Sequence, residues 1–347
     1  MLARLSARAS LVGDNAGAIE LASRAREVSQ EIGWQGGLAE ATNVRGIERV
    51  YAGDRGGLED IVKSIELAHA SGSAGVLARC LNTIAVAYQV LGEPGLGLVE
   101  RLEALAVSEQ VGSPSLLQWF DGVLADHHYR VGQWVEAARL ADSFLAAVDA
   151  GSPNVVAYQV YAVSAELRIA TGDLDGARGD AEATLLAGRG AGEVQALGYA
   201  LSAAAHVFAS AGATERAVVV ARELLDALDH GFPMQFAAVN LPMFAAAVTR
   251  VGLGERLPAA LDSHPRTVWT DVVCDYAAGD FAAAADRLQV IGATPDEAEA
   301  RRRAAEQLAD EGRRDEADEQ LRGALAFYRS VGATAYVREC EGSLSLR

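Results

Sequence analysis

The chain has 347 residues, of which 50% are hydrophobic, so it has ample apolar material for a core and lacks the composition of a disordered protein. Its 47 acidic and 30 basic residues give a formal net charge of −17, which disfavours nucleic acid and anionic lipid as partners. No apolar run approaches the roughly 18 residues of a membrane-spanning helix, and the first residues lack the pattern of a signal peptide.

The three cysteines, Cys80, Cys274 and Cys340, are far apart in the sequence and odd in number. Such a distribution indicates neither a disulfide framework nor a zinc cluster. We therefore expect a cytoplasmic protein with no metal and no cofactor.

Glycines divide the chain at a regular interval. They recur every forty residues through its middle, at Gly92, Gly132, Gly172, Gly212 and Gly252. An alanine stands seven residues before each of them, at Ala85, Ala125, Ala165, Ala205 and Ala245. A second glycine series follows about twenty residues later, at Gly33, Gly72, Gly112, Gly151, Gly231 and Gly332. Because glycine ends helices at little conformational cost, two breaks per period predict a repeated pair of helices, each pair forming an αα-hairpin.

In chain order, the pattern predicts helices at 2–12, 15–32, 36–52, 56–71, 75–91, 95–111, 115–131, 134–149, 154–171, 174–188, 193–211, 214–229, 234–251, 254–262, 267–278, 281–291, 296–311, 314–331 and 334–345. They make about nine hairpins of one all-α, right-handed superhelical solenoid, a single repeat domain spanning 1–347. The stretch 252–295 is irregular, because Pro258 and Pro265 interrupt it and the glycine step shortens to 27. The helix at 334–345 caps the array.

The unit from Asn82 to Gly92 carries a small residue at Ala85, a bulky one at Tyr88 and the terminal glycine. This pattern resembles the tetratricopeptide repeat in its longer, 40-residue form. In other units the bulky position is Arg49, His128 or Arg168, which departs from that consensus. The resemblance implies a superhelix whose first helices line a concave binding surface.

A narrower resemblance lies near the end of the chain, in Ala278-Gly279-Asp280-Phe281, Glu311-Gly312-Arg313-Arg314-Asp315-Glu316-Ala317 and the segment from Leu325 to Thr334. These segments resemble the C-terminal repeat region of actinobacterial-type ATPase, cyclase and LuxR-family signalling regulators. The resemblance implies a sensor or interaction region, with an ATPase or regulatory module as a partner. The single lysine, Lys63, is not part of a G-x-x-x-x-G-K-[ST] phosphate loop.

No pattern indicates catalysis, so we expect a protein that is not an enzyme. His127 and His128 are adjacent on a helix and point about 100° apart, which suits packing better than a shared metal. The sequence has no G-x-S-x-G motif. The glycine-rich run from Gly188 to Gly192 is interpreted as an interhelical turn. The arginines at 301–303, interleaved with glutamates, are interpreted as a solvated, ion-paired helix face.

Positions 13, 10, 6 and 3 residues before each repeat glycine share one helix face, which the resemblance places on the concave side. The candidate ligand- or peptide-binding residues on this groove are Arg79, Asn82, Gln89, Trp119, Asp126, Tyr129, Gln159, Glu166, Tyr199, His206 and Trp269. The alternative is that these aromatic side chains fill the space between neighbouring helices.

The leading hypothesis is a non-catalytic scaffold that binds a protein or peptide segment, with Asp126 and Glu166 favouring a basic partner. It would serve as the sensor or interaction region of a signalling or transcription-regulatory system. The alternative hypothesis is a sensor that binds a small-molecule inducer in the lumen of the solenoid.

Overall fold

The computed structural model describes residues 1–262 and 264–345, and within them every regular element is helical. The α-helices are α1 (Leu2–Leu11), α2 (Asn15–Glu31), α3 (Gln35–Tyr51), α4 (Gly57–Ser71), α5 (Ala74–Val90), α6 (Gly97–Val111), α7 (Pro114–Arg130), α8 (Trp134–Asp149), α9 (Ala157–Thr171), α10 (Leu174–Ala191), α11 (Val194–Ser210), α12 (Thr214–Asp229), α13 (Leu241–Arg250), α14 (Leu257–Leu261), α15 (Val268–Ala278), α16 (Phe281–Ile291), α17 (Thr294–Asp310), α18 (Arg314–Ser330) and α19 (Thr334–Ser345). Short 3₁₀ helices lie at Pro94–Leu96 (η1), Gln235–Asn240 (η2) and Gly254–Arg256 (η3).

Successive helices pack against each other in antiparallel pairs, so the chain is an all-α solenoid, as the glycine spacing predicts. Each of the predicted helices has a counterpart in the described residues, usually within three residues at either end. The glycines of both series adopt the left-handed conformation; Gly92, for example, has φ 80° and Gly112 has φ 69°. These glycines therefore mark the helix ends that they were expected to mark.

Two predicted boundaries are wrong. The helix expected at 234–251 is α-helical only from Leu241, because Pro242 lacks an N–H group and restricts the residue before it, so α13 starts there. The run from Gly188 to Gly192 is not a separate turn, because residues 188–191 form the last turn of α10 and Gly192 is its C-cap. Gly188 lets α11 approach closely, since a Cβ on it would lie only 2.4 Å from the Cβ of Ala200.

The helices in the stretch 252–295 are shorter than those of the regular hairpins. The α14 helix has only 5 residues, and α15 and α16 have 11 each. Pro258 lies in the first turn of α14. Helices elsewhere in the array have up to 18 residues, so this part of the solenoid is compressed.

Small residues form the seam between the two helices of a hairpin. Ala85, Ala125, Ala165, Ala205 and Ala245 are all 0% exposed. Gly46 occupies the same position in α3, where a Cβ on the facing Gly57 would lie 2.3 Å from the Gly46 carbonyl oxygen. Neighbouring helices approach this closely only where no larger side chain separates them.

The superhelix closes on itself after five hairpins. The glycine that ends α1 packs near Val194 of α11, and the one that ends α5 packs near Val268 of α15. The glycine after α7 likewise meets Thr294 of α17, and the one after α9 meets Ala335 of α19. In each case the carboxyl end of a first helix abuts the amino end of the first helix five hairpins later.

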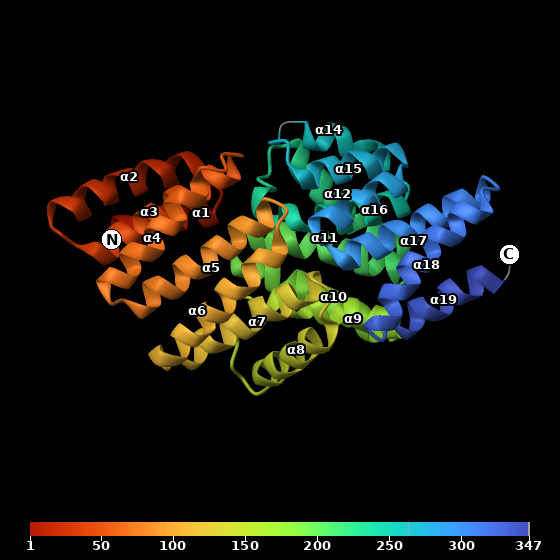
Figure 1. Ribbon diagram of the computed structural model, residues 1–347, viewed down its shortest axis with the longest axis horizontal. Helices are drawn as coiled ribbons and strands as arrows, with labels where there is room; N and C mark the ends of the chain where they lie inside the picture. The colour runs from red at the N-terminus through yellow and green to blue at the C-terminus, as the bar shows by residue number, and fades with distance from the viewer. Residues whose placement is uncertain (263, 346–347) are drawn as a thin grey trace.

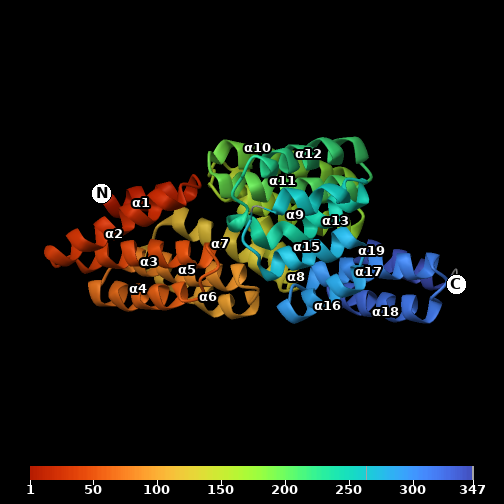
Figure 2. The ribbon, with the colours of Figure 1, turned by 90° about the horizontal axis from the view of Figure 1, so that it is seen from above.

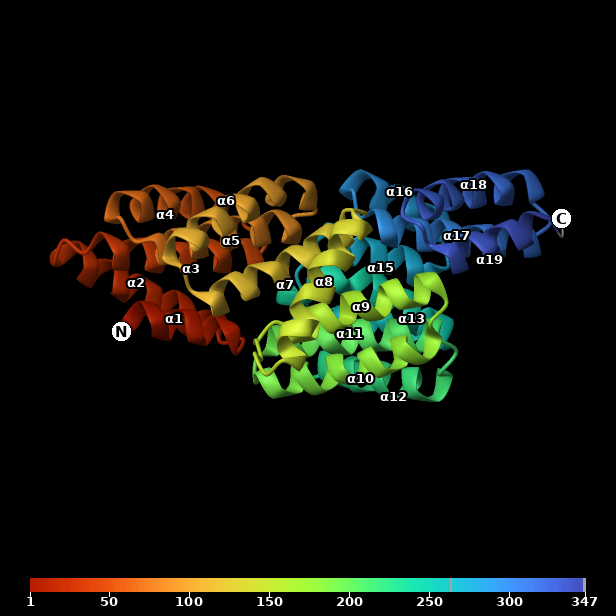
Figure 3. The same cartoon turned by 90° about the horizontal axis from the view of Figure 1, so that it is seen from below.

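Figure 1 shows the result as an elongated molecule, with α1–α6 forming one arm, α16–α19 the opposite end and α7–α13 the middle. Figures 2 and 3 show the molecule from above and from below the view of Figure 1. In both, helices α9–α12 lie to one side of the line that joins the two ends of the chain. The middle of the chain therefore makes the turn that brings distant first helices together.

The seam at Ala165 gives a test of the repeat register. We expect Ala165→Leu to destabilise the protein by about 1–3 kcal/mol, because the added side chain overpacks a closed helix contact. Urea denaturation measures the change. Ala146→Leu, at an exposed site on α8, is the matched control and should leave stability nearly unchanged. Equal stability of the two variants would show that the seam is assigned to the wrong residues.

Candidate functional site: the closed lumen

The predicted groove residues point inward from the first helices, but they do not share one open surface. Seven of them are buried: Gln89, Asp126, Tyr129, Glu166, Tyr199, His206 and Trp269. Four stay at least partly accessible: Arg79, Asn82, Trp119 and Gln159. Five of the buried residues lie near the carboxyl ends of their helices: Gln89, Asp126, Tyr129, Glu166 and His206. Tyr199 and Trp269 instead lie in the amino-terminal halves of α11 and α15. The next superhelical turn covers the carboxyl ends of α5, α7 and α9.

Asp126 and Arg130 of α7 form a buried ion pair that ties three elements together. The Arg130 Nε donates to Asp126 Oδ2 at 2.9 Å, and the Tyr199 hydroxyl of α11 donates to Asp126 Oδ1 at 2.6 Å. The Arg130 guanidinium also donates to the Val239 carbonyl at 3.1 Å and to the Asn240 side chain of η2. Burial raises the pKa of Asp126, but Arg130 outweighs it and holds that pKa below its usual value. Asp126 and Tyr199, which the sequence predicted as groove residues, therefore belong to a structural hydrogen-bond network.

Trp269 joins the two superhelical turns. Its indole Nε1 lies 3.0 Å from the carbonyl oxygens of both Gln89 and Val90, at the carboxyl end of α5. The Gln89 carbonyl also accepts from the Gly92 N–H at 3.1 Å, and the indole N–H adds a contact to both carbonyls from the other superhelical turn. Trp269 therefore fixes α15 on α5 and is not available to a ligand.

Glu166 of α9 and His206 of α11 form a second buried pair, with His206 Nδ1 2.7 Å from Glu166 Oε1. Burial opposes the charged imidazole, but the carboxylate of Glu166 outweighs burial and raises the pKa of His206. The pair is one repeat apart and lies on equivalent helix positions, as the glycine-referenced spacing predicts.

A small cavity adjoins this pair at the centre of the closed turn. Its volume is about 20 Å³, which is room for about one water molecule. The side chains around it come from both superhelical turns: Tyr129, Trp134, Glu166, His206, Met243, Ala246, Tyr276, Pro295, Asp296, Glu299, Tyr328 and Tyr336.

Four tyrosines form much of the cavity wall: Tyr129, Tyr276, Tyr328 and Tyr336. Burial raises the pKa of each phenol, so all four are neutral at physiological pH. Within the described part of the chain, none of their hydroxyl groups forms a hydrogen bond with a protein group. These hydroxyls are therefore free to donate to, or accept from, a molecule in the cavity.

Two carboxylates of α17 complete the site, and they differ in their partners. Glu299 pairs with Arg250 at 2.6 Å and with Arg302 at 2.7 Å. Burial raises its pKa, but these arginines outweigh burial and hold the pKa well below the ordinary value. Asp296 has no ion pair within the described residues, and burial raises its pKa to about 6. Asp296 therefore carries a negative charge at neutral pH without a direct ion pair, and Arg130 and His206 act on it only from a distance.

Sequence reasoning missed Asp296, Glu299, Tyr328 and Tyr336, all from α17–α19. Counting within one repeat does not reveal them, because they enter the lumen only through the five-hairpin closure. Arg301 and Arg302 are ion-paired, whereas Arg303 donates to the Ala246 carbonyl, and only 11% of the Arg302 side chain is exposed. The salt bridge between Arg302 and Glu299 makes it part of the wall of the site.

Among the described residues, no group of three or more His, Cys, Asp or Glu side chains has the arrangement of a metal site. In the same part of the chain, no helix is long and apolar enough to cross a membrane.

The Glu166–His206 pair makes a pH-dependent prediction. Because the folded-state pKa of His206 is raised, the pair contributes stability that is fully present below about pH 6.5 and is lost as the pH rises through the folded-state pKa. We expect Glu166→Gln to lower the melting temperature most near pH 6 and least near pH 9.

Glu182→Gln removes an exposed carboxylate from a salt bridge with Arg216 and serves as the control. The melting temperature of each variant is compared with that of the parent at the same pH, which cancels the titration of groups common to both proteins. A pH-independent effect of Glu166→Gln would mean that His206 is not charged in the folded protein.

Comparison with known proteins does not assign the chain to a family. The chain matches no model of a known protein family, and no curated protein shows significant sequence similarity to it.

Proposed function

We propose that the chain is a non-catalytic, tetratricopeptide-like sensor region of a regulatory system, and that its lumen binds a small, positively charged molecule. The observation that carries the proposal is the cavity where both superhelical turns meet. An enclosed site of this kind suits a small ligand, whereas an extended peptide needs an open groove.

Charge favours a cation in this cavity. Glu166 is balanced by His206, and Glu299 is balanced by Arg250 and Arg302. Asp296 is left as a buried carboxylate without a direct ion pair among the described residues. A ligand with one positive charge would relieve the cost of that buried charge.

The aromatic wall favours the same class of ligand. The faces of tyrosine and tryptophan rings attract cations, and amines also donate hydrogen bonds to phenol and carboxylate oxygens. Trp134 and Tyr129 are stacked, with centroids 5.4 Å apart, and Tyr328 and Tyr336 lie with centroids 4.7 Å apart. Both pairs line the same cavity as Asp296, and this combination suits an ammonium group.

Ligand size links binding to a signal. The cavity holds about one water, so a metabolite larger than ammonium must separate α17–α19 from α7–α11. A ligand that binds the opened form more tightly shifts the population toward it. The partner that reads this change would be an ATPase or another regulatory module, in keeping with the resemblance at the end of the chain.

A graded panel of amines tests the proposal. Thermal stability is measured with ammonium, methylammonium and larger primary amines against neutral alcohols of matched size. We expect amines, and not the alcohols, to raise the melting temperature by binding the folded protein. Asp296→Asn should remove the response, and without ligand it should be at least as stable as the parent near neutral pH, since it deletes a costly charge.

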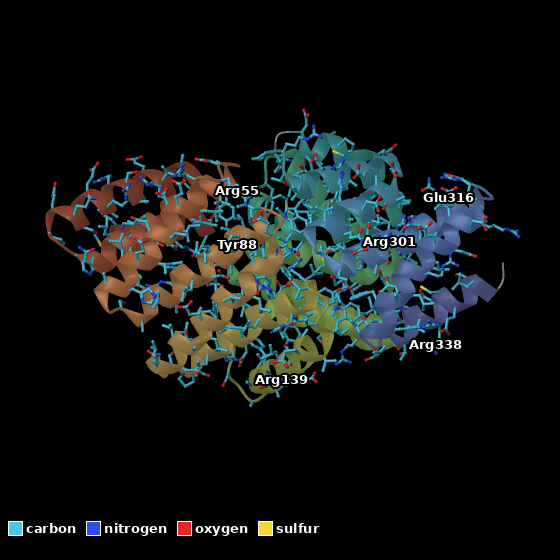
Figure 4. The ribbon with its side chains drawn as sticks, in the orientation of Figure 1. Arg55, Tyr88, Arg139, Arg301, Glu316 and Arg338 are labelled. Atoms are coloured by element: carbon cyan, nitrogen blue, oxygen red, sulfur yellow. The ribbon has the colours of Figure 1, made fainter. Side chains whose placement is uncertain are left out.

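The control is Glu316→Gln, which removes an exposed carboxylate at the far end of the molecule (Figure 4). It should leave the amine response unchanged. If no amine stabilises the parent, or if Asp296→Asn responds like the parent, the lumen does not bind a cation.

A second candidate function, binding of a peptide, is favoured by the four predicted residues that stay accessible. Arg79, Asn82, Trp119 and Gln159 lie in the amino-terminal halves of α5, α7 and α9, away from the covered ends. Trp119 is half-buried against Phe120, with ring centroids 4.9 Å apart, which leaves part of the indole for a partner. The net charge of −17 favours a basic segment.

A library of basic peptides tests this second function. If a peptide binds along these helices, Trp119→Ala should weaken it about tenfold, the loss typical of an aromatic anchor. Val290→Ala, at an 88% exposed apolar site on α16, is the matched control. Equal affinity of both variants would place any peptide site elsewhere.

A further inference from the structure

Arg101 of α6 is a buried cation without a carboxylate partner. It is only 4% exposed, and no Asp or Glu oxygen of the described chain lies within 4.0 Å of its guanidinium. Its contacts are neutral: the Val123 carbonyl at 3.1 Å, His127 Nδ1 at 3.1 Å and Gln89 Oε1 at 2.9 Å. A buried charge held only by neutral groups is costly, which distinguishes Arg101 from the paired arginines of the lumen.

Arg101 also fixes the hydrogen-bonding role of its neighbours. A guanidinium only donates, so the atoms that face it must accept. His127 must therefore be the neutral tautomer that carries its proton on Nε2, and Gln89 must turn its NH₂ group away from Arg101. By the same reasoning, Arg130 donates to Asn240 Oδ1 and leaves Nδ2 of Asn240 as a donor.

These assignments leave four buried donors without an acceptor in the described chain: Arg101 Nε, Gln89 Nε2, His127 Nε2 and Asn240 Nδ2. Each belongs to Arg101 or to a side chain whose other polar atom contacts Arg101 or Arg130. The group contains donors only. Arg101 also lacks a counter-charge of its own, because Asp126 is paired with Arg130, and Asp296 acts on Arg130 and not on Arg101.

We propose that the interior between α5, α6, α7 and η2 binds a small inorganic anion of the size of chloride. An anion can accept from more than one N–H group at once and supplies the counter-charge that Arg101 lacks. A water molecule accepts from two donors at most, adds two hydrogens that find no acceptor here, and carries no charge.

The titration behaviour of the site agrees with this role. Burial and the neighbouring Arg101 lower the pKa of His127 to about 3, so the ring stays neutral and keeps a donor on Nε2. Burial lowers the pKa of Arg101 to about 10, so it remains charged at neutral pH. The positive charge of the site is therefore present under physiological conditions.

Thermal denaturation at constant ionic strength tests the proposal, with sodium chloride replacing sodium gluconate, whose anion is too large for the site. The melting temperature of the parent should rise with chloride and saturate, as binding to the folded state requires. Bromide, which scatters anomalously, should give a peak beside Arg101 in crystals grown with sodium bromide.

Two variants assign the effect to this site. Arg101→Met removes the cation, and Gln89→Glu supplies a built-in carboxylate at the position that already accepts from Arg101. Both should lose the dependence on chloride, and Gln89→Glu should be at least as stable as the parent in gluconate. Arg139→Met is the control, because Arg139 lies on the surface of α8 (Figure 4) and should leave the dependence intact.

Two results of thermal denaturation would overturn the proposal: identical melting curves of the parent in chloride and gluconate, or an equal chloride response in Gln89→Glu and Arg139→Met. Two crystallographic results would also overturn it: a water-like density without a bromide peak, or a bromide peak without chloride-dependent stability. The last would mean binding at crystal concentration only. If Arg101→Met does not fold, Gln89→Glu alone decides the outcome.

Discussion

The contact between the carboxyl end of one first helix and the amino end of the first helix five hairpins later determines the interior of this molecule. It brings together ends of opposite partial charge, since helix dipoles are negative at the carboxyl end and positive at the amino end. At α5 the contact is also specific, because the Trp269 indole donates to two terminal carbonyls. Without this contact the lumen would be an open groove. With it, Asp126, Glu166 and His206 become buried, and each of them is held in a buried ion pair.

The closure divides the interior into two regions of opposite electrostatic character. On one side, the cavity near Asp296 holds an unbalanced carboxylate among phenol rings. On the other, Arg101 leaves an unbalanced cation among N–H donors. The Asp126–Arg130 pair lies on α7, which contributes residues to both regions. Both regions contain buried polar groups, which a solenoid core built only from alanine and leucine would lack.

The helices and their order follow from sequence, because glycine and proline act locally and fix helix ends wherever they occur. The inward direction of Asp126, Glu166, Tyr199 and His206 follows too, since it depends only on helical spacing. What sequence reasoning could not provide is the number of hairpins per superhelical turn. That number is the sum of small rotations between hairpins, each set by side-chain packing, and the compressed stretch at 252–295 changes it. The burial of Trp269 and the entry of Asp296 into the lumen depend on that sum.

The closure also determines the order in which parts of the molecule can fold during synthesis. The carboxyl end of α9 at Gly172 leaves the ribosome more than 160 residues before its partner Ala335 on α19. At about 5–20 residues per second, that interval lasts on the order of ten to thirty seconds. For that time the nascent solenoid presents Glu166, His206 and Tyr129 to solvent, as an unclosed repeat protein would. Its early hairpins can form by local contacts, but the lumen is completed only when the last helix has emerged.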